Sequence, residues 1–120
     1  MAIVDYKELV AWQRAMDLVV EVYGASRRFP REEIYGLTNQ VRRAAVSVPS
    51  NIAEGQGRGA ANDFARSLRI ANGSRQEVET QIIVAQRLGY LDEETCAKPL
   101  SLCVEAGRLI SGLLRSLQGV

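Results

Sequence analysis

Four polar residues on one face of a predicted helix are the group in this chain best placed to do chemistry together. Arg43, Ser47, Asn51 and Glu54 lie four, four and three residues apart, which is the spacing of neighbours on a helical face. A carboxylate beside a hydroxyl could act as a general base next to a nucleophile. The same small polar groups could instead meet another helix at close range. An ordinary solvated face with a few serines is the third interpretation left open.

The composition argues against catalysis at this face. The 120 residues include no histidine, which removes the commonest general base and a usual ligand of metal sites in helical bundles. Cys96 and Cys103 are seven residues apart, or about 10 Å along one helix, so we expect buried free thiols and no zinc site. The sequence predicts that the protein is not an enzyme and uses no metal or cofactor. The weaker alternative is an enzyme with its site at the polar face described above.

A second row of polar residues matches the first. Ser67, Ser74 and Gln81 recur every seven residues, so they follow one edge of a helix. We predict that this edge meets the polar face of the other helix. The residues expected at that helix or subunit contact are Arg43, Ser47, Asn51 and Glu54. Of these, Asn51 and Glu54 are predicted to be buried.

Helical periodicity and capping residues divide the chain into four expected helices. They cover about 5–28, 38–55, 62–88 and the stretch from 92 onward. The predicted caps are Asp5 in a capping box with Glu8, then Thr38, Asn62 and Asp92. Short connectors between amphipathic helices are typical of an up-down-up-down bundle. The sequence therefore predicts a single all-α domain over 1–120, the four-helix bundle.

The first helix carries more apolar residues than one bundle face requires. Its main predicted stripe consists of Leu9, Trp12, Met16, Val19, Val20 and Tyr23. Further apolar residues extend that stripe, namely Ala11, Ala15, Leu18 and Val22. Three neighbouring helices cannot cover so wide an arc, and large exposed apolar patches are rare on monomers. We therefore expect a homo-oligomer, with Leu18 and Val22 at a helix or subunit contact.

Charge is unevenly distributed although the net charge is only +1. Residues 41–75 carry six arginines against Glu54 and Asp63, and residues 76–105 are mainly acidic. Arginine favours bidentate contacts with phosphate or carboxylate, although genomic base composition can produce the same bias. The residues expected to bind nucleic acid or an acidic partner are Arg42, Arg58, Arg66 and Arg69. Alternatively, Arg42 and Arg43 pair with Glu79 or Asp92 of a neighbouring subunit.

Several motifs resemble those of a bacterial four-helix bundle family, the intervening-sequence proteins associated with the large ribosomal RNA gene. The central motif runs from Gln40 to Gly55, as QVRRAAVSVPSNIAEG. Matching residues outside it are Tyr6 to Leu9, Trp12-Gln13, Tyr35 to Leu37, Phe64, Gly73-Ser74, Glu77, Glu79 to Gln81 and Leu88 to Leu91. Arg75 and Pro99 depart from the family pattern, which puts the local packing of the last two helices in question.

The resemblance implies a bundle that assembles as a homopentameric barrel. The chain is similar, more distantly, to accessory variability proteins of diversity-generating retroelements, which hold a reverse transcriptase and its RNA with a basic surface. We accordingly expect a non-enzymatic oligomeric scaffold that binds RNA, DNA or a reverse transcriptase. The alternative is a structural or adaptor protein with no role in nucleic-acid binding. No segment has the length of a signal peptide's apolar run or of a membrane span, so we expect a cytoplasmic protein.

Overall fold

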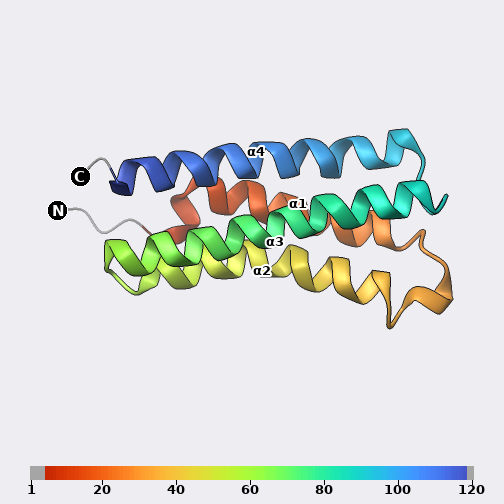
Figure 1. Cartoon of the computed structure of the whole chain (residues 1–120), viewed down its shortest axis with the longest axis horizontal. Coiled ribbons are helices and arrows are strands. Elements are labelled where there is room, and N and C mark those ends of the chain that lie inside the picture. Colours follow the sequence, from red (N-terminus) through yellow and green to blue (C-terminus); the bar gives the residue numbers. More distant parts are fainter. Residues whose placement is uncertain (1–4, 119–120) are drawn as a thin grey trace.

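The computed structural model describes residues 5–118, and this part of the chain is built from four long helices without a strand (Figure 1). The helices are α1 (Val10–Ser26), α2 (Leu37–Gly57), α3 (Ala61–Arg87) and α4 (Glu93–Gln118). Two short 3-10 turns, η1 (Tyr6–Glu8) and η2 (Arg31–Glu33), precede α1 and α2. The predicted all-α four-helix architecture is confirmed.

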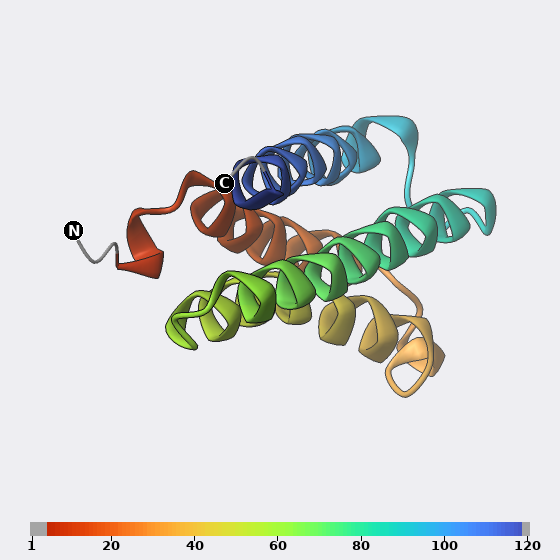
Figure 2. The ribbon, with the colours of Figure 1, turned by 60° about the vertical axis from the view of Figure 1, so that its left-hand side comes forward.

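Each helix packs against the helices before and after it, and α4 returns to α1. The neighbouring pairs are α1 with α2, α2 with α3, α3 with α4, and α4 with α1, whereas the backbones of α1 and α3 lie diagonally across the bundle. Figure 2 shows α2 and α3 running side by side, with α4 over α1. The α2–α3 turn lies at one end of the bundle, and the α1–α2 and α3–α4 connections lie at the other (Figure 1).

Capping geometry explains where the first two long helices begin. Asp5 accepts a hydrogen bond from the Lys7 backbone N–H at 2.9 Å, so it caps η1, and extended Leu9 separates that turn from α1. The predicted capping box at the start of a single long helix is therefore wrong. At α2, Glu33 Oε1 accepts from the Leu37 N–H at 3.0 Å, and Thr38 is buried inside the helix. A carboxylate from the preceding turn replaces the predicted Thr38 cap.

The prediction for α4 is confirmed at its start. Asp92 Oδ1 accepts from both the backbone N–H of Thr95, at 2.8 Å, and its hydroxyl, at 2.7 Å. The helix begins at Glu93 and includes Pro99, which is buried. Pro49 likewise lies inside α2 and is buried. Neither proline ends its helix.

The core stripe of α1 is the one that the sequence suggested as an extension. The buried apolar residues of α1 are Ala11, Ala15, Leu18, Val22 and Ala25. Met16, Val20 and Tyr23 are exposed instead. Small residues let the backbones of neighbouring helices approach, so the alanine-rich side turns inward. Leu18 and Val22 therefore contact other helices in the core of one chain. The prediction that they belong to an exposed apolar patch is wrong.

Candidate interaction surfaces

Hydrogen bonds between polar side chains join α2 and α3 along one seam. The Oγ atoms of Ser47 and Ser74 are 2.9 Å apart, and Asn51 donates to the carbonyl and Oγ of Ser47 at 2.8 and 2.9 Å. Gln81 Nε2 donates to Gln40 Oε1 at 3.4 Å. The prediction that the polar row of α3 contacts the polar face of α2 is confirmed at Ser74 and Gln81.

A glycine at the far end of the seam sets the closest approach of the two helices. A Cβ at Gly55 would lie 2.4 Å from the Cβ of Ser67, a distance that real side chains do not reach. Ser67 is buried at this contact. The absence of a side chain at Gly55 therefore lets α2 and α3 converge toward their turn.

The four polar residues singled out from the sequence do not converge on a catalytic arrangement. Ser47 and Asn51 belong to the seam, where Asn51 is half-buried, whereas Arg43 is exposed. Glu54 is 63% exposed in its side chain and pairs with Arg58 at 3.0 Å. The predicted burial of Glu54 is wrong because the helical period carries it past the seam to the outer face of α2. Within this face, the Glu54 carboxylate pairs with the Arg58 guanidinium.

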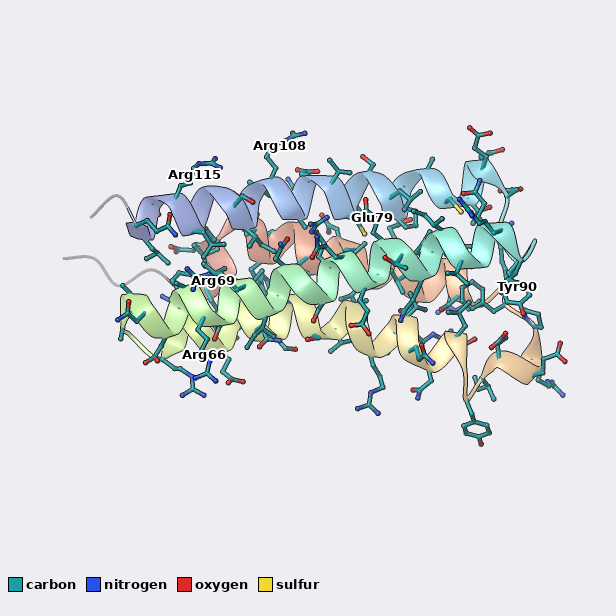
Figure 3. All side chains as sticks on the ribbon, in the orientation of Figure 1. Arg66, Arg69, Glu79, Tyr90, Arg108 and Arg115 are labelled. Atoms are coloured by element: carbon teal, nitrogen blue, oxygen red, sulfur yellow. The ribbon has the colours of Figure 1, made fainter. Side chains whose placement is uncertain are left out.

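The end of the bundle at the α2–α3 turn holds arginines together with acidic residues; we call it the α2–α3 end. Arg58 and Arg66 line a hollow of about 250 Å³ with Glu54 and Asp63. The hydrogen bond to Glu54 raises the pKa of Arg58. Arg66 and Arg69 are exposed near this end (Figure 3) and make no ion pair among the described residues.

Arg42 lies apart from the other three predicted arginines. Its Nε donates to Ser26 Oγ at 2.8 Å, and its guanidinium lies 4.7 Å from the centroid of the Tyr23 ring. This contact joins α2 to the end of α1. The four predicted binding residues therefore do not form one surface.

The end of the bundle near η2, which we call the α1–α2 end, has a hollow that the sequence reasoning missed. Its volume is about 700 Å³, and no residue described along its lining is acidic. The residues that give it chemical character are Tyr23, Ile34, Tyr35, Arg42 and Arg43, and we call them the tyrosine–arginine surface. Tyr35 is 93% exposed. The sequence signal that could have pointed to this hollow is Tyr35, an aromatic residue in a short polar connector.

A hydrogen-bonded carboxylate holds the connector that carries Tyr35. Glu33 Oε2 accepts from the hydroxyl of Tyr90 at 2.8 Å, while its Oε1 caps α2 at Leu37. The hydrogen bond from the Leu37 N–H lowers the pKa of Glu33 most, and the bond from the Tyr90 hydroxyl lowers it further. The bond between Tyr90 and Glu33 in turn raises the pKa of Tyr90. Tyr90 also packs against Phe29, with ring centroids 5.6 Å apart. Three segments are thus tied together beside the hollow.

Arg75 is accommodated between α3 and α4 because its neighbour is a glycine. A Cβ at Gly107 would lie 2.8 Å from the Arg75 guanidinium, whose Nε donates to Asn72 at 3.0 Å. Arg75 also pairs with Glu79, one turn later in the same helix, at 3.5 Å. Cys103 lies buried nearby, and burial raises its pKa to about 12. Both cysteines are buried free thiols, as predicted.

The described residues contain no cluster of three histidine, cysteine, aspartate or glutamate side chains able to hold a metal ion. Within residues 5–118, no helix combines the length and apolar character needed to cross a membrane.

Comparisons with known proteins place the chain in a family. A family profile described as 23S rRNA-intervening sequence protein matches residues 7–112. No curated protein matches the chain. Among solved structures, the chain is similar to a protein of unknown function from the S23 ribosomal protein family of Bacteroides thetaiotaomicron VPI-5482. That likeness has a TM-score of 0.80 at 19% identity, covers 88% of this chain and 98% of the other, and concerns the fold alone. Because the profile spans most of its length, the chain belongs to the 23S rRNA-intervening sequence protein family.

Proposed function

We propose that this protein is a non-catalytic helical scaffold that assembles into a closed ring of identical subunits. The supporting observation is that two exposed apolar patches lie on helices that are diagonal to each other in the bundle. The α1 outer stripe comprises the exposed Met16 and Val20, flanked by the partly buried Trp12 and Val19, and the α3 outer patch comprises Ile83, Val84 and Leu88. Val20 is 66% exposed and Leu88 is 56% exposed.

The positions of the two patches favour a ring over a twofold dimer. A twofold contact uses one self-complementary patch, whereas a cyclic assembly needs two different patches on each subunit. Because α1 and α3 are diagonal in the bundle, the α1 outer stripe and the α3 outer patch face different directions. Val20 and the α3 outer patch both lie toward the C-terminal ends of their helices, which end at the same end of the bundle (Figure 1). The number five comes from the family resemblance alone.

Light scattering with size-exclusion chromatography tests the ring. We expect a mass several times 13.2 kDa for the wild type, and a single subunit for Val20→Lys and for Leu88→Lys. An equimolar mixture of these two variants should give a dimer, because each supplies the intact patch that the other lacks. The matched control is Val104→Lys, which charges an apolar residue 50% exposed on α4 and should leave the mass unchanged.

A wild-type mass of one chain would contradict the proposal. So would a stable dimer unaffected by either lysine, since that would place the contact on another face.

A second proposed function is the binding of nucleic acid by the assembled scaffold. Arg43 is exposed, forms no ion pair within the described part of the chain and lines a hollow together with Arg42. A ring would repeat these charges and multiply weak phosphate contacts. The family name refers to 23S rRNA, which makes RNA the first nucleic acid to test. A reverse transcriptase carrying RNA stays a proposal that rests on the distant resemblance.

Electrophoretic mobility shift with RNA over a series of salt concentrations tests this second function. Binding should weaken steeply as salt rises, because affinity comes from releasing counterions from phosphates. Absence of a shift at low salt would reject the nucleic-acid role and leave the scaffold proposal standing.

A further inference from the structure

The tyrosine–arginine surface combines exposed aromatic area with positive charge. Tyr35 and Tyr23 are exposed at 93% and 37%, and Arg42 and Arg43 line the same hollow. A second hollow, of about 410 Å³, adjoins it through Ile34 and Arg42, which line both. The second hollow adds two further arginines, Arg27 and Arg31. Four arginines thus line two adjoining hollows.

The charges around these hollows are not neutralised by the residues that line them. No described residue lining either hollow is acidic. By contrast, the hollow at the α2–α3 end contains Glu54 and Asp63 beside its arginines. Of the two acidic residues in the connector, Glu33 already accepts from Leu37 and Tyr90, and Glu32 lines neither hollow. Acidic residues do occur in neighbouring hollows, where Arg27 lies with Glu21, Asp92 and Glu94, and Arg43 lies with Glu77. Within these two hollows, a polyanion therefore meets less competition than in the hollow at the α2–α3 end.

The Arg42 side chain and the backbone of the turn that carries Tyr35 are ordered before any ligand arrives. Arg42 is fixed through Nε by Ser26 and lies over the Tyr23 ring, which leaves the outer nitrogens of its guanidinium for other contacts. Tyr35 sits in a turn whose backbone is defined by hydrogen bonds from Gly36 N to Glu33 O at 2.9 Å and from Ile34 N to Arg31 O at 3.1 Å. Presentation on an ordered turn reduces the entropy lost on binding.

We infer that the tyrosine–arginine surface binds single-stranded nucleic acid, with a base stacked on Tyr35 and phosphates contacted by Arg42 and Arg43. Aromatic side chains beside a positively charged groove are what single strands require, because every base has a face that stacks. A duplex keeps its bases stacked internally and offers none to Tyr35. The inference rests on the proposed nucleic-acid role and specifies its site and its ligand.

The test is fluorescence anisotropy with a labelled single-stranded RNA of mixed sequence at low salt. The same measurement is made with single-stranded DNA of the same sequence and with an RNA duplex. The intact protein should bind both single strands more tightly than the duplex. Tyr35→Ala should weaken single-strand binding about tenfold or more, and Tyr35→Phe should restore it, because the ring supplies the stacking. Arg43→Glu should also weaken binding and make its salt dependence shallower.

The matched control is the double variant Arg66→Glu with Arg69→Glu, which reverses exposed charge near the other end and should leave binding nearly unchanged. Tyr35 and Arg43 are exposed, so thermal melting of their variants should match the wild type. Wild-type affinity in Tyr35→Ala would overturn the inference. Loss of binding in the Arg66 and Arg69 variant alone would overturn it while preserving the nucleic-acid role.

Two further outcomes concern the partner. If the wild type binds no oligonucleotide, both the inference and the nucleic-acid role fall. If it binds poly-glutamate but no oligonucleotide, the surface belongs to an acidic protein partner and the inference is again wrong.

Discussion

The two ends of this bundle use the same residue type in opposite settings. At the α2–α3 end, Arg58 pairs with Glu54, and Asp63 lies in the same hollow as Arg66. At the α1–α2 end, Arg42 lies over Tyr23, and its hollow has no acidic residue along its described lining. Arginine content therefore says little about where a polyanion binds. The neighbours of each arginine determine whether its charge is available.

Two glycines, one near each end of the bundle, also differ in how closely neighbouring side chains pack against them. Gly55, near the α2–α3 turn, faces Ser67 so closely that no Cβ fits, whereas a Cβ at Gly24, near the end of α1, would meet nothing within 4 Å. Gly55 therefore lies within a helix–helix contact, whereas Gly24 faces open space.

The largest effect on stability is expected from replacing a glycine with alanine, once near each end. Gly55→Ala should destabilise the protein by about 1–3 kcal/mol, because overpacking must push α2 and α3 apart. Gly24→Ala should stabilise it by roughly 0.5–1 kcal/mol, since alanine restricts the unfolded chain and fits the helix without a clash. Urea denaturation measures both. Changes of the same sign would mean that the two ends are packed alike.

A smaller effect is expected from the hydroxyl pair in the middle of the seam. Ser74→Ala should cost about 1 kcal/mol, because it leaves the Ser47 hydroxyl with one partner fewer. A double-mutant cycle with Ser47→Ala isolates the coupling between the two residues. A coupling of zero would show that the serine pair contributes nothing to the convergence of α2 and α3.

The smallest effect is a pH dependence at the α1–α2 end. The folded-state pKa of Glu33 lies below its ordinary value of 4.5. Its contribution to stability is therefore complete above the unfolded pKa and disappears as the pH falls through the lowered folded pKa. Glu33→Gln should consequently lose less stability in acid than the wild type. Melting temperatures measured from neutral to acidic pH test this, and parallel curves for the two proteins would contradict it.

The sequence was sufficient to predict the four helices and the polar seam between α2 and α3. Helical periodicity and the Asp92 cap act locally, so four helices and the start of α4 were predictable. The seven-residue spacing of Ser67, Ser74 and Gln81 was enough to predict their partner helix. The Arg75–Glu79 pair was predictable because it lies within one helical turn.

The errors arose where tertiary neighbours decided the outcome. The helical pattern predicts Met16, Val20 and Tyr23 for the core because larger apolar residues dominate it, whereas close packing selects Ala11, Ala15 and Leu18. Leu9, Trp12 and Val19 of the predicted stripe do pack against the core. Glu33 displaced Thr38 as the α2 cap through a turn that no helical pattern reveals. The tyrosine–arginine surface joins the end of α1 to the start of α2, so its residues meet only after folding.

We expect nucleic acid to contact the arginines of the α1–α2 end and not those of the α2–α3 end. Photo-crosslinking of thiouridine-substituted single-stranded RNA, followed by mass spectrometry of the tryptic peptides, tests it most directly. The account predicts crosslinks in the peptide of residues 32–42, which contains Tyr35. Crosslinks confined to residues 59–75 would contradict it.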